Sequence, residues 1–301
     1  MLFQGCGTAM VTPFRKDGSL DEPTLRSLVK RQINEGINFL VPCGTSGESP
    51  TLTREEHLRV VEITLEEAAG RVRVLAGAGG YNTAEVIELA QDLKAMGVDG
   101  ILSVTPYYNK PTQEGLYQHY KAIASAIKIP IVVYSVQGRT GVNVEPATLK
   151  RLAEIDYVVG VKEASGNIGQ MAAIVQQVPP SFAVLSGDDA ITIPLIALGG
   201  HGLVSVISNE LPGEMTALVQ RALANDFAAA RALQRRYFSL MEVNFVESNP
   251  IPVKAAMALM GLLQPVWRLP LCAPSPANQA KIEKVLETLG LLAASRSVHA
   301  V

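Results

Sequence analysis

The chain has 301 residues, of which 48% are hydrophobic, 18% are charged and only 5% are aromatic. Its formal net charge of −2 excludes the strongly basic surface that proteins use to bind nucleic acids or anionic membranes, so we expect a small-molecule partner. The sequence shows no signal-peptide pattern, and no apolar run reaches the roughly 18 residues of a membrane span. We therefore expect a cytoplasmic protein that binds neither membrane nor nucleic acid.

Short apolar or β-branched runs alternate with longer amphipathic stretches over the first two thirds of the chain. Strands are predicted at 7–12, 37–42, 72–76, 100–105, 129–134, 157–162, 182–186 and 202–206. Helices are predicted between them at 23–35, 54–69, 83–97, 115–127, 146–153, 169–177 and 190–198. Thr53 and Glu56 form the capping-box pattern at the start of one helix, and Asp21 caps another.

Eight strand-helix units predict a closed (β/α)8 TIM barrel of the α/β class, because open parallel sheets usually stop at fewer strands. We assign the barrel to residues 1–225. The remainder, 226–301, reads as a C-terminal helical region. Helices are predicted at 214–224, 227–244, 252–260 and 278–289, followed by a frayed tail at 293–301.

Polar side chains follow several of the predicted strands. In this fold the carboxyl ends of the strands form the active-site face, so these residues are expected to meet there. They are Thr45 and Ser46, Tyr107 and Tyr108, Tyr134 with Arg139, and Gly187 with Asp188 and Asp189. The Thr45-Ser46 turn suits a carboxylate or phosphate oxygen, although it could equally be a capping turn. Asp188 and Asp189 are expected to cap the next helix.

The strand at 157–162 ends on Lys162, where a buried parallel strand should stay apolar unless its last residue has a task. Alone, Lys162 could be a surface lysine. Beside phenols, hydroxyls and an arginine, it fits an imine-forming nucleophile, since burial favours the neutral amine that attacks a carbonyl. Tyr134 is the natural proton carrier, although Tyr134 could also be a core phenol and Arg139 a surface loop residue.

Metal and cofactor chemistry are not expected. The four histidines show no metal-binding spacing. Cys6, Cys43 and Cys272 are far apart and predict neither a disulfide framework nor a zinc site, so we expect them to be buried as small apolar residues. A phosphate-binding barrel is disfavoured because two carboxylates, Asp188 and Asp189, follow the seventh strand. An unphosphorylated keto acid is the preferred substrate.

Five motifs together resemble the dihydrodipicolinate synthase and N-acetylneuraminate lyase family of pyruvate-dependent class I aldolases. The resemblance spans nearly the whole chain. The motifs are Val-Thr-Pro-Phe at 11–14, Gly-Thr-Ser-Gly-Glu-Ser at 44–49, Val-Thr-Pro-Tyr-Tyr-Asn-Lys-Pro at 104–111, Gly-Val-Lys-Glu-Ala-Ser-Gly-Asn at 160–167 and Asn-Pro-Ile-Pro-Val-Lys at 249–254.

The resemblance implies a lyase of the diaminopimelate and lysine pathway, in which Lys162 forms a Schiff base with pyruvate and the enamine attacks L-aspartate 4-semialdehyde. Tyr134 would relay protons through Thr45 to Tyr108, which in this family comes from a neighbouring subunit of a homotetramer built as a dimer of dimers. Thr45 and Ser46 would hold the pyruvate carboxylate, and Arg139 the carboxylate of the second substrate. Gly187 and Val204 complete the expected substrate-binding set.

One stretch departs from the family pattern. Ser135 and Gln137 stand where the family's synthases usually have asparagine and proline, and Gln137 leaves the loop less rigid. The alternatives are therefore a 4-hydroxy-2-oxoglutarate aldolase or N-acetylneuraminate lyase activity, or a catalytically inactive member. In the family's lysine-feedback pocket, Ser49, His57, Glu85 and Tyr107 match while Pro50, Arg54 and Tyr81 do not, which predicts weak or absent inhibition by lysine.

Overall fold

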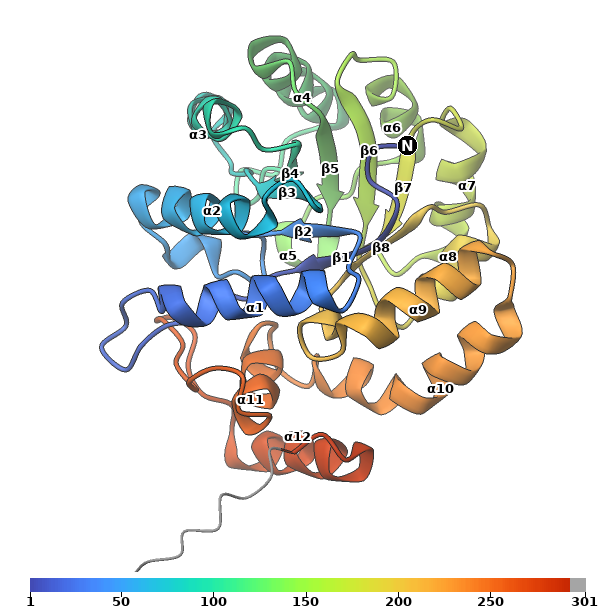
Figure 1. Ribbon diagram of the computed structural model, residues 1–301. Coiled ribbons are helices and arrows are strands. Elements are labelled where there is room, and N and C mark those ends of the chain that lie inside the picture. Colours follow the sequence, from blue (N-terminus) through green and yellow to red (C-terminus); the bar gives the residue numbers. More distant parts are fainter. Residues whose placement is uncertain (293–301) are drawn as a thin grey trace, which may run out of the picture.

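Eight parallel strands pair in sequence order and close on themselves, because β8 also pairs with β1. The computed structural model describes residues 1–292 and confirms the predicted (β/α)8 TIM barrel (Figure 1). The strands are β1 (Gly5–Ala9), β2 (Phe39–Val41), β3 (Arg73–Gly77), β4 (Gly100–Val104), β5 (Ile131–Ser135), β6 (Val158–Glu163), β7 (Ala183–Ser186) and β8 (Gly202–Ser205).

Helices surround the barrel and extend beyond it. They are α1 (Glu22–Asn34), α2 (Arg54–Ala68), α3 (Thr83–Met96), α4 (Gln113–Ile127), α5 (Gln137–Thr140), α6 (Pro146–Leu152), α7 (Ile168–Gln177), α8 (Thr192–Ala197), α9 (Pro212–Leu223), α10 (Phe227–Val243), α11 (Ile251–Leu259) and α12 (Pro276–Leu289), with 3-10 turns η1 (Ser49–Thr51) and η2 (Ile207–Asn209). None of those in residues 1–292 is long and apolar enough to span a bilayer.

Local sequence signals explain most of the boundaries. Asp21 accepts a hydrogen bond from the Thr24 amide at the start of α1, and Thr53 with Glu56 forms the predicted capping box of α2. The first strand differs from its prediction at 7–12 and ends at Ala9, because the Val11 amide donates to the Asn209 side chain instead. Helix α5 was not predicted, and the predicted tail at 293–301 lies outside the described residues.

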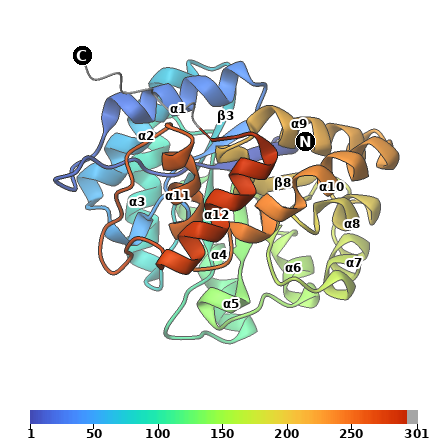
Figure 2. The same ribbon diagram turned by 90° about the horizontal axis from the view of Figure 1, so that it is seen from below.

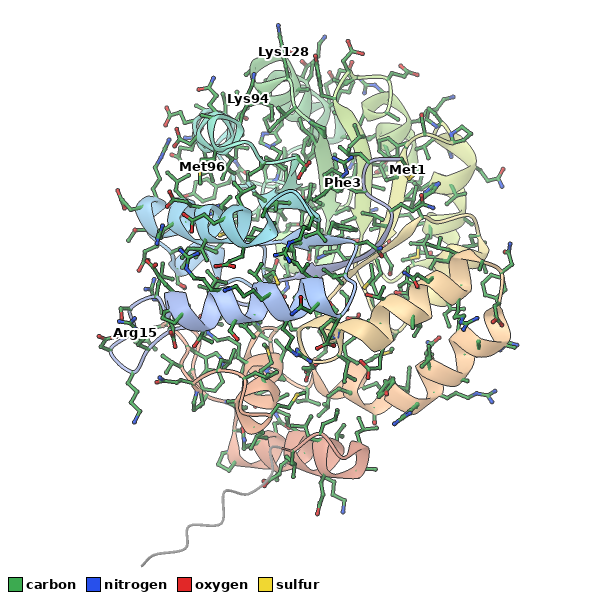
Figure 3. The ribbon with its side chains drawn as sticks, viewed as in Figure 1. Met1, Phe3, Arg15, Lys94, Met96 and Lys128 are labelled. Atoms are coloured by element: carbon green, nitrogen blue, oxygen red, sulfur yellow. The ribbon has the colours of Figure 1, made fainter. Side chains whose placement is uncertain are left out.

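Two apolar layers hold the barrel together. One lies between the strands and the outer helices, and the smaller one fills the barrel interior. Phe3, labelled near the strands in Figure 3, packs edge to face on Phe39 at 5.6 Å and is 1% exposed, so it closes the amino-terminal end. The site can therefore open only at the other end of the barrel.

The C-terminal helices cover that other end. Helices α11 and α12 lie beyond the strand arrowheads in Figure 1 and in front of the barrel in Figure 2. Of the nine residues of α11, seven are buried, including the charged Lys254, so this helix is enclosed by the rest of the protein rather than lying on its surface. The predicted division at residue 225 falls in the turn between α9 and α10 and remains a prediction.

Candidate active site

Lys162 and Tyr134 lie side by side inside the barrel. They are paired residues of adjacent parallel strands, so their side chains leave the sheet on the same face. Both are buried, at 4% and 6% exposure, and Lys162 Nζ lies 4.1 Å from the centre of the Tyr134 ring. Gly187 makes room for the lysine, because a Cβ there would come within 3.1 Å of Lys162 Cε.

Lys162 forms no ion pair within the described part of the chain. Among residues 1–292, no carboxylate lies within 4.0 Å of its Nζ, whereas the buried Lys254 is paired with Glu48. The next residue, Glu163, faces the outer helices and accepts a hydrogen bond from Gln170 of α7. Burial raises the pKa of Glu163, opposed by hydrogen bonds from Ser165 and Gln170.

A cavity of about 690 Å³ opens at the carboxyl ends of the strands. Its walls bring together Thr45, Tyr134 and Arg139, which come from the segments after β2, at the end of β5 and in α5. Val204 lies deeper, fully buried among the interior residues that also include Tyr134. Within residues 1–292, no cluster of three or more His, Cys, Asp or Glu side chains is arranged to hold a metal ion.

Ser46 and Arg139 are joined by a residue that sequence reasoning did not single out. Asn249 Nδ2 donates to Ser46 Oγ at 3.0 Å, and its backbone oxygen accepts from Arg139 Nη2 at 3.0 Å. Asn249 also lines the cavity. Its only signal in the sequence is its place in the 249–254 motif that carries the family resemblance.

A buried ion pair fixes the turn that carries Thr45 and Ser46. Lys254 Nζ of α11 donates to Glu48 Oε1, and both side chains are fully inaccessible to solvent. Glu48 Oε2 also accepts from the Arg268 amide at 3.2 Å. The two cations lie over the Phe14 ring, at 4.4 Å for Lys254 and 4.2 Å for Arg268. Burial lowers the pKa of Lys254, and the Glu48 carboxylate opposes this.

The two departures from the family pattern, Ser135 and Gln137, are not part of the cavity wall. Ser135 Oγ accepts a hydrogen bond from the Val144 amide at 3.2 Å, outside the barrel. Gln137 is exposed and begins α5, where the first amides of a helix have no intrahelical acceptor, so this position accepts glutamine and proline alike. Neither side chain lines the cavity wall, which Val136, Arg139 and Thr140 form in this stretch.

Three predicted residues lie elsewhere than expected. Asp189 does not cap α8, which has Ile191 at its N-cap and no side-chain cap, and Asp188 instead accepts from the Ala190 amide. The Asp189 carboxylate is buried and accepts from Ser205 Oγ at 2.5 Å and from the Val206 amide at 3.0 Å. Cys6 and Cys43 are buried as predicted, but Cys272 is exposed because it lies in the irregular loop between α11 and α12.

Tyr108 does not join the cavity of its own chain. Its side chain is 91% exposed, and its backbone has φ +66°, a left-handed conformation that is uncommon for residues other than glycine. The preceding Tyr107 lines the cavity and packs edge to face on Tyr81 at 5.3 Å. The loop after β4 thus divides two adjacent phenols between the interior and the surface.

The model of the dihydrodipicolinate synthetase family matches residues 2–289. The chain belongs to this family. Among curated members it is similar to the 4-hydroxy-tetrahydrodipicolinate synthases of Koribacter versatilis, with 53% identity over 97% of this chain and 98% of the relative, and of Chloroherpeton thalassium, with 49% identity over 97% of each. The fold is similar to the crystal structure of dihydrodipicolinate synthase from Thermotoga maritima, with a TM-score of 0.95 and 44% identity over 97% of this chain and 100% of that one.

Membership in the dihydrodipicolinate synthetase family confirms the resemblance drawn from the five motifs. Members of this family are lyases of the class I aldolase type that use a Schiff-base lysine. The structure brings Lys162, Tyr134 and Gly187 together, and gathers Thr45 and Arg139 around one cavity. The roles assigned to these side chains in the sequence remain predictions.

Proposed function

We propose that this chain is a 4-hydroxy-tetrahydrodipicolinate synthase that condenses pyruvate with L-aspartate 4-semialdehyde through a Schiff base on Lys162. One observation carries the proposal: a buried lysine without a counter-charge lies against a phenol, at the cavity end of the barrel. Neither departure from the family pattern lines the cavity, which favours the synthase over the other aldolase activities.

The first half-reaction follows from the placement of Lys162. Its neutral Nζ attacks C2 of pyruvate to form a carbinolamine, which loses water to give the imine. The Tyr134 phenol is adjacent and carries the protons that these steps move. Thr45 and Ser46 hold the pyruvate carboxylate, at a turn fixed from beneath by Glu48 and Lys254.

The second half-reaction joins the two substrates. Loss of a proton from the pyruvate methyl group gives an enamine, whose terminal carbon attacks the aldehyde carbon while the aldehyde oxygen gains a proton. The amino group of the acceptor then attacks the imine carbon, displaces Lys162 and closes the ring. Arg139, in the cavity wall, binds the carboxylate of the acceptor.

We further propose a cytoplasmic homotetramer, built as a dimer of dimers, in which Tyr108 completes the proton relay of a neighbouring subunit through Thr45. The exposure of Tyr108 and its strained backbone support a role outside its own chain. Sedimentation tests the assembly, and mixing inactive Lys162→Ala chains with inactive Tyr108→Phe chains tests the donation. Restored activity in the mixture supports it, and none would contradict it.

Borohydride reduction in the presence of pyruvate tests the central proposal. We expect a pyruvyl adduct on Lys162, located by mass spectrometry of the digested protein. Lys254, the other buried lysine of residues 1–292, is the matched control, because its Nζ is paired with Glu48 and it does not line the cavity. An unmodified Lys162 would contradict the mechanism and would favour the alternative that this chain is a catalytically inactive family member.

Coupled assays then identify the acceptor. Pyruvate and L-aspartate 4-semialdehyde should give product, whereas 4-hydroxy-2-oxoglutarate and N-acetylneuraminate should not be cleaved. Adduct formation without turnover of the semialdehyde would support the imine chemistry but contradict the synthase assignment.

A further inference from the structure

Asn249 occupies a position between the two halves of the site. It immediately precedes Pro250 and α11, its side chain is 6% exposed, and it lines the cavity together with Thr45 and Tyr134. Its side chain contacts Ser46, which is 203 positions away in the sequence, while its backbone oxygen contacts Arg139, 110 positions away. One residue thus touches the predicted pyruvate side and the predicted acceptor side.

The contact with Ser46 sets the direction of a hydroxyl group. A serine hydroxyl has one hydrogen to donate, and its oxygen can accept. Ser46 Oγ accepts from Asn249 Nδ2, and it donates to no residue that the structure describes. Because Ser46 is 1% exposed, bulk water does not compete for that hydrogen. The accepted hydrogen bond therefore leaves the Ser46 O–H free to donate to a ligand.

The contact with Arg139 depends on the backbone and not on the side chain of Asn249. Any residue at position 249 supplies the same carbonyl oxygen. The Asn249 Oδ1 atom makes no hydrogen bond with any residue in the described part of the chain. Replacing the side chain consequently removes a single described hydrogen bond, the one to Ser46.

We propose that Asn249 is a positioning residue that holds the Ser46 hydroxyl as a hydrogen-bond donor to the substrate carboxylate. The inference rests on the proposed function, because it takes the carboxylate of the imine-forming keto acid as the ligand of Ser46. Asn249 acts on pyruvate through Ser46 and leaves the acceptor carboxylate to Arg139. The C-terminal region therefore takes part in substrate binding as well as in covering the barrel.

The test is the pyruvate dependence of the rate of imine formation. Asn249→Ala should raise the half-saturating pyruvate concentration about tenfold, the effect of losing one hydrogen bond in a site that binds a charged group. Asn249→Asp keeps the shape but accepts the Ser46 hydrogen and adds a negative charge beside the carboxylate, so it should raise that concentration about a hundredfold or more. The KM of the acceptor should change by less than about threefold, because any effect on the acceptor is indirect.

Ser46→Ala and the double variant distinguish positioning from general support of the fold. If Asn249 acts through Ser46, Asn249→Ala should add nothing to the effect of Ser46→Ala. Additive effects, or equal effects on both substrates, would overturn the proposal. Asn143→Ala is the matched control, because its amide also bonds a side chain, that of Gln170, yet it does not line the cavity.

The outcome separates this inference from the proposed function. Absence of a pyruvyl adduct in the unmodified chain rejects the function itself. A normal adduct in the unmodified chain with unchanged pyruvate dependence in Asn249→Asp rejects the role of Asn249 alone. If the alanine variant does not fold, the aspartate variant and Ser46→Ala still decide, since the proposal requires both to weaken pyruvate binding.

Discussion

Lys162 Nζ lies 4.1 Å from the centre of the Tyr134 ring, and the two residues are paired across adjacent strands. The register of β5 and β6 thus brings the amine and the phenol together without any flexible loop. The ring covers the lysine, and its hydroxyl is available for proton transfer. These two contributions can be separated experimentally.

Tyr134→Phe keeps the ring over Lys162 and removes only the hydroxyl. We expect imine formation with pyruvate to slow by about 10² to 10⁴, the usual contribution of a general acid-base group, while thermal unfolding stays unchanged. Rapid mixing followed by borohydride quenching measures the rate. Tyr134→Leu removes the ring as well and should also lower stability. A Phe variant as fast as the parent would show that Tyr134 does not carry the proton.

Arg139→Ala should raise the KM of the semialdehyde by about 10- to 100-fold and leave the KM of pyruvate nearly unchanged, because a charged hydrogen bond to the acceptor carboxylate is lost. Arg139→Lys keeps the charge but loses the planar fork, so it should recover only part of the affinity. Steady-state kinetics with each substrate varied separately measures both. Equal changes in both KM values would argue against a clamp for the acceptor.

Glu48→Gln should cost about 3 to 5 kcal/mol of unfolding free energy, because it leaves the buried Lys254 without its counter-charge. The double variant Glu48→Gln with Lys254→Met should regain part of this loss. Urea unfolding provides the measurement. The exposed pair of Arg151 and Glu114 is the control, and Glu114→Gln should change stability little. A Glu48→Gln chain as stable as the parent would contradict the importance of the pair.

Asp189 should make stability fall as the pH rises from about 4 to about 6. Burial raises the pKa of Asp189 to about 6, although hydrogen bonds from Ser205 and Val206 oppose the rise. An aspartate in an unfolded chain has a pKa of about 3.9, so the native state alone holds this proton between about pH 4 and pH 6. The resulting stabilisation is complete below about pH 4 and is lost as the pH rises through 6.

Asp189→Asn should therefore gain about 3 kcal/mol relative to the parent chain between pH 4 and pH 7, at about 1.36 kcal/mol for each unit of the raised pKa. Urea unfolding at several pH values, taken as the difference between the two chains, measures this. Asp17→Asn is a control of opposite sign, because the Ser19 hydroxyl lowers the pKa of Asp17. A difference that does not vary with pH would show that Asp189 is ionised throughout.

L-Lysine should bind with a Kd weaker than about 1 mM and inhibit little. His57, Glu85 and Tyr107 line the cavity, but so does the cationic Arg54. The positive charge of Arg54 would repel the ammonium groups of L-lysine. Arg54 is held there by Asp92 at 2.6 Å. Calorimetric titration measures the affinity, and Arg54→Ala should increase it. Micromolar binding to the unaltered chain would contradict the prediction.

The sequence was sufficient for the barrel and for much of the site, for a physical reason. Parallel strands buried on both faces are continuous apolar runs, so Lys162 at the end of such a run is conspicuous, and the carboxyl ends of all eight strands meet at one face. The placement of Tyr134 and Thr45 around one cavity follows from that geometry, whereas Arg139 reaches it from α5, which was not predicted.

Contacts between distant segments were not predictable in the same way. Neither Asn249 nor Lys254 lies at a strand end, and their partners are 203 and 206 positions away, so no local pattern relates them. Asp189 fits a capping pattern but is buried against Ser205 of the next strand, since tertiary contacts replace the local one. The direction of the Ser135 side chain depends on the strand register, because a shift of one residue would turn the side chain to the opposite face of the sheet.

The pairing of Glu48 with Lys254 also bears on the order in which the protein is made. The turn that holds Thr45 and Ser46 leaves the ribosome early, while the helix that fixes it is among the last segments to be translated. We expect a chain released before α11 to contain all eight strands and both Lys162 and Tyr134. In such a chain the turn that carries Thr45 and Ser46 would lack the contact that fixes it. Completion of synthesis would then coincide with the onset of activity.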